Sequence, residues 1–297
     1  MRTPKNLSQI STGIKALALK AMNNLSSSDP AYHVAKHRAI RPVDYMRCAE
    51  FEAILRDLKI LPQMQVLDIS SPQWFSLYLA EKHPETVFHY INIIDAELDP
   101  YKKIAHALGI RNLKYQKADV RELKFNNSTF DKVVSISVIE HVYPEEDGDL
   151  RALREIKRVL KSQGELLLTI PYKEKSNIVY INGPVYERGE KKRNFFAREY
   201  DKDMFYNLIE RSGFVVKDSW FICERKGMFA VDYYEWGPGK DNWFAKYFIK
   251  SRRLVEPVLG RALDEVLAKH YLSVSREITG RLVNISAVLA KALLPDL

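Results

Sequence analysis

The sequence predicts a doubly wound α/β domain in the middle of the 297-residue chain. The first observation is segment 130–141, FDKVVSISVIEH, where the apolar residues from Val133 to Ile139 are interrupted only by serines. A strand that reads as a near-continuous apolar run is buried on both faces, as strands of parallel sheets are. Secondly, similar runs occur upstream at 65–69 and 87–94, and thirdly, a helical pattern and another strand follow downstream. Alternating strands and helices indicate a sheet whose ligand lies at the carboxyl ends of its strands.

Helices are expected on either side of these strands. Residues 44–58 place apolar side chains among charges, which predicts an amphipathic helix that leads into the first strand. Residues 151–160 space their apolar residues at helical intervals. We expect Gly164 to end this second helix before a strand at 165–170.

The pattern continues less regularly towards the C-terminus. We expect a helix at 203–212, a strand from Phe214 and a final strand from Trp220. From 255 to 293 the spacing is helical and amphipathic, which predicts a helical tail docked on the domain. Dimerisation of this tail, or its contact with a membrane, are the alternatives.

Acidic residues close three of the predicted strands. Asp68 ends the first, Asp95 the second, and Asp119 a short third strand (LKYQKAD). Segment 130–141 and the segment LKSQGELLLTIPY follow these three strands. In this order, the five segments resemble the class I S-adenosylmethionine-dependent methyltransferases, in particular those that act on small molecules. The resemblance covers roughly residues 60–172. It implies a Rossmann-like seven-stranded, mostly parallel sheet with helices on both faces, to which this chain adds helical extensions at both ends.

The resemblance divides the chain into three parts. Residues 1–58 are expected to form an N-terminal helical extension, 59–225 the methyltransferase-like α/β domain, and 226–297 an aromatic-rich and helical C-terminal extension. An insert at 173–200 mixes aromatic and basic residues. In the family such an insert commonly forms the acceptor pocket, and the alternative is a surface hairpin whose aromatic residues pack on the body.

The loop after the first strand departs from the family pattern. The family has three glycines there, which let the backbone approach the cofactor. This chain has Ser70, Pro72 and Trp74 in their places. Serine is small and can donate a hydrogen bond, and proline can begin a helix. Trp74 is compatible with cofactor binding only if its indole turns away from the mouth of the loop.

The resemblance implies S-adenosylmethionine as the cofactor and assigns residues to it. A carboxylate after the second strand can accept hydrogen bonds from both ribose hydroxyls, for which we expect Asp95, with Glu97 and Asp99 as the alternatives. Asp119 and the amide of Val120 are expected to meet the adenine. The complete expected set is Asp68, Ser70, Asp95, Asp119, Val120 and Ser135.

The acceptor is expected to meet the far end of the same cleft. By the resemblance His141 lies at its lip, where an imidazole of ordinary pKa can remove a proton from a hydroxyl or amine. A structural role for His141 in orienting the loop is the alternative, since proximity alone can drive methyl transfer. The expected acceptor-binding residues are Tyr45, Arg47, Tyr172, Tyr186, Arg188 and Arg198.

These residues predict a methyltransferase that acts on a small-molecule or a glycan-linked or lipid-linked acceptor, with oxygen as the expected atom methylated. The rival hypothesis is a non-catalytic binding or scaffolding protein that kept the fold after its glycine loop changed. Failure to bind the cofactor would favour this rival.

Composition limits the other classes of function. The net charge of +8 is concentrated on both sides of the central domain, which leaves open a peripheral contact with a membrane. No RNA-binding motif is present, and nucleic acid is not an expected partner. His33 and His37 share a helical spacing without a third ligand nearby, so we expect no metal. The two cysteines and the lack of a long apolar run indicate a cytoplasmic protein, while the oligomeric state stays open.

Overall fold

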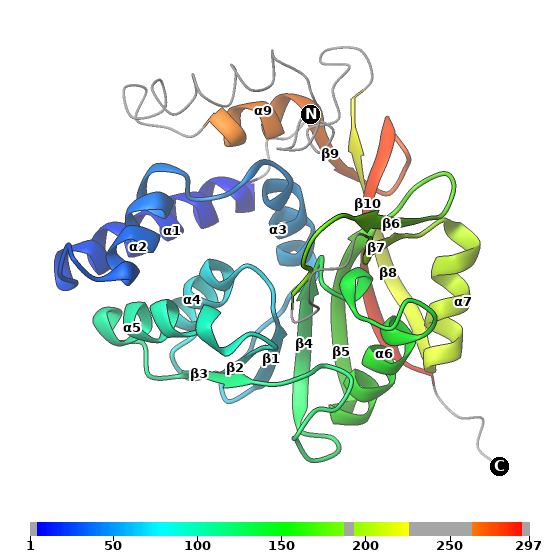
Figure 1. Ribbon diagram of the computed structural model, residues 1–297, viewed down its shortest axis with the longest axis horizontal. Helices are drawn as coiled ribbons and strands as arrows, with labels where there is room; N and C mark the ends of the chain where they lie inside the picture. The colour runs from blue at the N-terminus through cyan, green and yellow to red at the C-terminus, as the bar shows by residue number, and fades with distance from the viewer. Residues whose placement is uncertain (1–4, 187–192, 226–262, 293–297) are drawn as a thin grey trace.

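The computed structural model describes residues 5–186, 193–225 and 263–292. Its centre is an eight-stranded sheet with the order β3-β2-β1-β4-β5-β10-β8-β9 (Figure 1). Strands β1 to β5 pair in parallel, and β10 pairs antiparallel with both β5 and β8. The strands are β1 Gln65–Ile69, β2 Val87–Asn92, β3 Leu113–Lys117, β4 Phe130–Ile136, β5 Leu160–Pro171, β8 Phe214–Glu224, β9 Leu272–Ser275 and β10 Arg281–Lys291. The predicted Rossmann-like α/β class is confirmed, with one more strand, β9, than expected.

Helices cover both faces of the sheet (Figure 1). Helices α4 Gln73–Lys82 and α5 Asp99–Leu108 lie on one face, and α6 Gly148–Val159 and α7 Lys202–Ser212 lie on the other. Successive strand residues supply the two faces in turn: Val66 and Val134 join the core under α4 and α5, whereas Leu67 and Val133 join the core under α6 and α7. This period of two explains the continuous apolar runs in the sequence, because both faces of each strand are buried.

The N-terminal extension consists of α1 Lys5–Asn24, α2 Pro30–Ile40 and α3 Tyr45–Asp57, and the Asp29 carboxylate caps α2 by accepting from the amide of Ala31. Helices α1 and α2 pack outside α4 and α5, whereas α3 packs directly on the sheet beside β5, β8 and β10 (Figure 1). The apolar face of α1 is buried in the same core as α3 and α4; its members are Ile10, Ile14, Leu17, Ala18 and Ala21. The apolar face of α1 is therefore already occupied by the body of the protein. Among the described residues, no helix combines the length and the apolar character needed to cross a bilayer.

The C-terminal extension differs from the predicted helical tail. Only α9 Leu263–Tyr271 is helical in the described part of it, and residues 272–275 and 281–291 are strands. Residues 226–262 lie outside the described residues. The error has a physical reason: β10 is buried along eight consecutive residues, and periodicity cannot distinguish a short buried strand from a buried helix. The boundary expected at residue 225 therefore divides a single sheet.

Two smaller differences concern the ends of elements. Helix α6 ends at Val159, and Gly164 lies inside β5 rather than between the helix and the strand. The two strands expected from Phe214 and from Trp220 are one continuous strand, β8.

The predicted insert contains a hairpin. Strand β6 Asn177–Ile181 pairs antiparallel with β7 Asn194–Glu199, in a sheet separate from the central one. A bridge between Tyr172 and Tyr200 fixes the base of the hairpin beside the end of β5. This places β7 against the short helix η2 Ile139–His141, which follows β4.

The central position of β10 predicts that the chain needs its C-terminal strand to fold. A chain that ends at residue 225 lacks β10, whose Ile285, Ala287 and Leu289 are buried between β5 and β8. We expect this truncated chain to show no cooperative thermal unfolding and no near-ultraviolet circular dichroism. A control chain that ends at residue 292 retains all of β10 and should unfold cooperatively. Cooperative unfolding of the shorter chain would contradict the assigned sheet order.

Candidate active site

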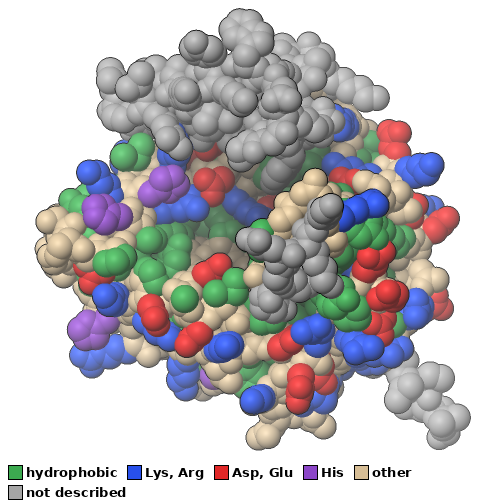
Figure 2. Space-filling model, in the orientation of Figure 1, with side chains coloured by type: hydrophobic (Ala, Val, Ile, Leu, Met, Phe, Trp, Pro, Cys, Tyr) green, Lys and Arg blue, Asp and Glu red, His purple; other side chains and the backbone are tan. Residues whose placement is uncertain are grey.

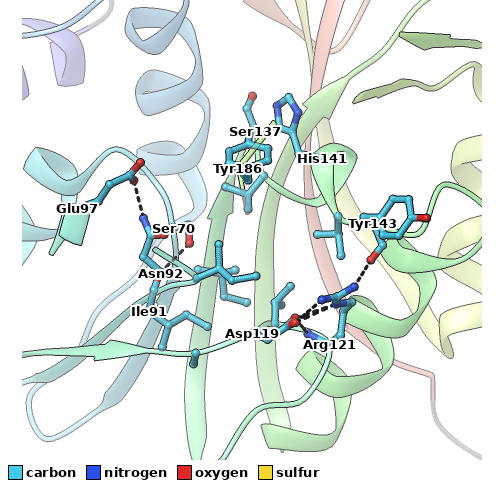
Figure 3. Close-up of a pocket in the computed structure, with 16 residues that line it drawn as sticks. Ser70, Ile91, Asn92, Glu97, Asp119, Arg121, Ser137, His141, Tyr143 and Tyr186 are labelled. Carbon is cyan, nitrogen blue, oxygen red and sulfur yellow. Dashed lines mark hydrogen bonds and ion pairs between the residues drawn. The ribbon is translucent and has the colours of Figure 1, made fainter. Parts of the chain in front are cut away.

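An open cleft lies at the carboxyl ends of the parallel strands, where the chain order reverses between β1 and β4. Such switch points are the usual ligand sites of open α/β sheets. The cavity has a volume of about 190 Å³, and Figure 3 shows its lining residues around a common space. In Figure 2 hydrophobic side chains form the floor of a hollow near the centre of this face, with charged side chains around it. The lining residues are Ile69, Ser70, Ile91, Asn92, Ile93, Glu97, Ala118, Asp119, Val120, Arg121, Ser137, Val138, His141, Val142, Tyr143 and Tyr186.

The altered loop after β1 leaves the cleft open. Ser70 has a φ of 50°, the left-handed conformation that glycine adopts easily, and its hydroxyl donates to the carbonyl of Ile91 at 2.8 Å. Pro72 is the residue before α4, and Trp74 is 3% exposed. The Trp74 ring packs edge-on against Tyr101, with the ring centroids 6.3 Å apart. The indole is thus buried against α5, outside the lining of the cleft.

Asp68 and Ser135 belong to the predicted cofactor set, but the structure places both behind the lining. The Asp68 carboxylate accepts from the amide of Ser71 at 2.9 Å and from the hydroxyl of Ser76, so it holds the first turn of α4. Burial raises the pKa of Asp68 to about 6. Ser135 is completely buried. Asp68 therefore shapes the loop, while neither side chain reaches the open space.

After β2, a carboxylate other than the expected one lines the cleft. The Glu97 carboxylate accepts a hydrogen bond from the side-chain amide of Asn92 at 3.1 Å. The main-chain carbonyl of Glu97 accepts one from the side-chain amide of Gln73 at 3.0 Å. Asp95 lies outside the lining and is 3.6 Å from the ammonium group of Lys102. Glu97, one of the alternatives in the sequence analysis, is therefore better placed than Asp95. A short helix, η1 Asp95–Glu97, turns these side chains in different directions, which the sequence does not reveal.

Asp119 and Val120 line the opposite end of the cleft, as expected. The Asp119 carboxylate accepts from the backbone amide of Arg121 at 2.8 Å and from its guanidinium at 3.0 Å. Burial alone would raise the pKa of Asp119, but the hydrogen bonds and charge of Arg121 lower it below its ordinary value. The same guanidinium donates to the carbonyl of Tyr143, so Arg121 joins two walls of the cleft (Figure 3). Arg121 was missed in the sequence, although a basic residue two positions after the acid was an available signal.

His141 lies at the other side of the cleft, near Ser137 and Tyr186 (Figure 3). Its Nδ1 is 2.7 Å from the carbonyl oxygen of Phe196 in β7. A carbonyl can only accept, so this contact places a hydrogen on Nδ1 and leaves Nε2 of the neutral ring as a proton acceptor. The rings of Phe196 and Tyr186 flank the imidazole, with centroids 4.7 Å and 5.9 Å away.

A buried polar cluster lies beside His141 and escaped the sequence analysis. Glu50 of α3 is fully buried, and its carboxylate accepts from Thr169 at 2.9 Å, from Asn284 at 2.8 Å and from Ser137. These three partners stand at the ends of β5, β10 and β4 respectively. Glu140, in η2, is equally buried, and burial together with the charge of Glu50 raises its pKa to about 8.

The predicted acceptor-binding tyrosines are divided between the cleft and the core. Tyr186 lines the cleft. Tyr45 is 3% exposed and donates to Glu224 at 2.8 Å, and Tyr172 packs against the rings of Phe205 and Phe221. Tyr45 and Tyr172 are thus placed as packing residues.

The predicted arginines are held within the protein where the structure describes them. Arg47 forms an ion pair with Glu50. Arg198 is 1% exposed and donates to carbonyls of the loop after η2, at 3.0 Å to Val142 and 2.8 Å to Glu145. Arg198 therefore supports the loop that follows His141 and does not line the cleft. Arg188 lies outside the described residues.

Comparison with known families identifies the central unit. Residues 67–168 match the family model of the methyltransferase domain. These residues form a methyltransferase domain. The match runs from β1 to β5, the strands whose ends surround the cleft, and it confirms the resemblance to class I S-adenosylmethionine-dependent methyltransferases.

Individual relatives are more distant. An uncharacterised protein of Methanocaldococcus jannaschii is 40% identical over 57 residues, which cover 19% of this chain and 23% of that protein. The chain thus spans about a quarter of the length of this curated relative. Among solved structures, the cyclase SpnF aligns with a TM-score of 0.51 at 14% identity, over 99% of this chain and 98% of its own. The YcgJ protein from Bacillus subtilis aligns with a TM-score of 0.50 at 14% identity, over 81% and 97% of the two chains. These similarities support the fold.

The cofactor of this family is S-adenosylmethionine, and the lining of the methyltransferase domain's cleft fits it. Ser70 adopts a glycine-like backbone where the family has its first loop glycine. Glu97 and Asn92 offer hydrogen-bonding groups for ribose hydroxyls, and Asp119 and Val120 line the end expected for adenine. Among the described residues, no group of three or more potential ligands is arranged for a metal ion.

The burial of Trp74 predicts that restoring the family glycine harms the protein. Trp74→Gly should lower the free energy of unfolding by about 3 kcal/mol or more, because a large buried side chain is lost. The expected fall in Tm is roughly 5 to 10 °C. Ser70→Gly is the matched control, since glycine suits the positive φ of that position, and its Tm should stay within about 2 °C. Equal stability of both variants would contradict the buried position of the indole.

The raised pKa of Glu140 predicts a pH-dependent effect on stability. The folded protein holds this proton up to about pH 8, whereas an unfolded glutamate releases it near 4.5. The contribution of this proton to the free energy of unfolding is therefore complete below pH 4.5 and is lost as the pH rises through 8. Glu140→Gln cannot lose a proton, so its Tm relative to the parent protein should rise by several degrees between pH 5 and pH 9. Thermal unfolding at both pH values tests this, with exposed Glu146→Gln as the control that shows no such trend.

Proposed function

We propose that this chain is an S-adenosylmethionine-dependent methyltransferase that methylates a hydroxyl of a small-molecule or a glycan-linked or lipid-linked acceptor. The methyltransferase domain supplies the reaction class. The observation that carries the acceptor side is His141, which lines the cleft with Nδ1 occupied by the Phe196 carbonyl and Nε2 as its proton-accepting nitrogen. When bound, the cofactor supplies an electrophilic methyl group.

Different residues along the cleft would bind different parts of the cofactor and the acceptor. Glu97 and Asn92 would orient the ribose, Asp119 and Val120 the adenine, and His141 would take the proton from the acceptor hydroxyl. Orientation itself contributes much of the rate in such a transfer, because it replaces a bimolecular encounter by a defined approach. The rings of Tyr186 and Phe196 beside His141 favour an acceptor with an apolar body next to its hydroxyl.

Binding without methyl transfer is the second candidate. The fold alone does not specify the reaction, since the structural neighbour SpnF is named as a cyclase. Against this candidate, the loop that lost its glycines keeps the positive φ at Ser70 and turns Trp74 away from the cleft.

Titration calorimetry with S-adenosylhomocysteine tests the cofactor site. We expect the parent protein to bind, and Glu97→Ala to raise Kd at least about tenfold, because the ribose would lose hydrogen bonds to a charged group. Asp95→Ala is the matched control from the same short helix, and its Kd should stay within about twofold. The reverse order of the two variants would restore the original assignment of Asp95. No binding by the parent protein would contradict the proposed function.

Transfer itself requires a screen of hydroxylated acceptors with methyl-labelled S-adenosylmethionine. For an acceptor that is methylated, His141→Gln should bind S-adenosylhomocysteine normally and react about 100-fold more slowly. An unchanged rate would assign His141 a structural role.

A further inference from the structure

Two buried carboxyl groups lie next to the acceptor side of the cleft, and the family assignment gives them no role. Glu50 comes from α3, outside the methyltransferase domain, and Glu140 comes from η2. Their exposed fractions are 0% and 1%. Burying two acidic side chains together is unfavourable unless each is neutralised or fully hydrogen-bonded.

Glu50 meets this requirement. Its carboxylate has an ion pair with Arg47 and accepts hydrogen bonds from Ser137, Thr169 and Asn284. Donors from an adjacent helical turn and from three strand ends thus surround it. Its role is explained by packing alone.

Glu140 meets this requirement only by holding a proton, because its carboxyl is not fully hydrogen-bonded. Its Oε2 atom is buried and has no hydrogen-bond partner, and its Oε1 atom lies 3.9 Å from Nε2 of His141. Burial and the charge of Glu50 raise its pKa to about 8, while Arg47 and Ser137 only partly oppose this. An unmatched buried carboxyl beside a site residue calls for an explanation.

The other charged and titratable groups around Glu140 are engaged elsewhere. Arg198 of β7 donates to the main-chain carbonyl of Glu140 and to those of the following loop. The hydroxyl of Tyr200, also in β7, donates to Asp149 at 2.9 Å.

Arg47 and Glu50, whose charges also act on Glu140, are paired with each other. His141 is the imidazole that lies beside the Glu140 carboxyl, with Nε2 3.9 Å from Oε1.

We propose that Glu140 is a positioning residue for His141, and that the two side chains bind and release one proton as a unit when the acceptor is deprotonated. The inference rests on the proposed function. The acceptor oxygen would form a bond to the methyl group as the methyl–sulfur bond of the cofactor breaks and S-adenosylhomocysteine is left. The acceptor O–H bond would break in the same step, and its proton would form a bond to Nε2 of His141. The Glu140 carboxylate then faces an imidazolium, and the two charges compensate each other in the buried site. The Phe196 carbonyl keeps the ring in the orientation this requires.

This arrangement sets the pH range in which His141 can act. Below about pH 8 the Glu140 carboxyl holds a proton, so the unit is already occupied. Above this pH it is empty and can accept the proton of the acceptor. The base function should therefore increase as the pH rises through 8.

The test is a pH titration of the full chain labelled with ¹³C and ¹⁵N in histidine, followed by nuclear magnetic resonance. The ring signals that disappear in His141→Gln belong to His141. In the parent protein we expect these signals to move through a step near pH 8. In Glu140→Gln this step should be absent, and His141 should titrate as a single group at least one pH unit lower. Glu146 is exposed and lies five positions after His141, so Glu146→Gln should leave the step in place.

Several results would overturn the inference. One is a parent protein whose His141 signals show no step near pH 8, a measurement that does not depend on any variant folding. Another is an unchanged step in Glu140→Gln, which would assign the step to another group. The titration needs no cofactor, so it is independent of the S-adenosylhomocysteine measurement. If the parent protein does not bind S-adenosylhomocysteine but its His141 signals show the step near pH 8, the proposed function is overturned. If it binds S-adenosylhomocysteine but shows no such step, only the pairing of Glu140 with His141 is overturned.

Discussion

The buried carboxylate of Glu50 is the interaction on which the acceptor side of this protein depends. It joins three parts of the chain that are far apart in sequence: α3, the ends of β4 and β5, and β10. Removing one partner of a buried charge typically costs about 3 to 5 kcal/mol, because the charge that remains is uncompensated. The N-terminal helices and the C-terminal strand are therefore tied to the methyltransferase domain at the place where its cleft opens, and the family match at residues 67–168 covers only part of a larger folded unit.

The loop after β1 illustrates how a site can keep its geometry while its sequence changes. Glycines are common in such loops because they adopt a positive φ and leave room for a ligand. Ser70 retains the backbone conformation and replaces the lost freedom with a hydrogen bond to Ile91. Trp74 fills space between α4 and α5 instead of space in the cleft. The tryptophan that stands in place of a family glycine therefore lies in the core, where a large apolar side chain contributes to stability.

Charge in the site is controlled mainly by pairing. Arg121 holds Asp119 ionised, and Arg47 compensates Glu50. For Glu140 the charge of Arg47 and the Ser137 hydroxyl only partly offset burial, so this carboxyl beside His141 binds and releases a proton near pH 8. Strongly perturbed carboxyl groups of this kind concentrate at functional sites, and here the perturbation has a visible cause in burial and a neighbouring acid.

The sequence by itself determined the α/β class and the positions of β1 to β5 along the chain, because buried parallel strands leave a continuous apolar pattern. It also determined which part of the chain lines the cleft, because the ends of these strands carry the site. It also identified His141, Ser70, Asp119, Val120 and Tyr186, which all line the cleft. Only the tertiary structure decided that β10 is a central strand, since its apolar run reads equally well as a helix, and that Glu97 rather than Asp95 faces the cleft, since this depends on the turn of η1. The contact of Glu50 with Asn284 spans 234 residues, and no local pattern encodes a pairing that forms only when both ends of the chain fold onto one sheet.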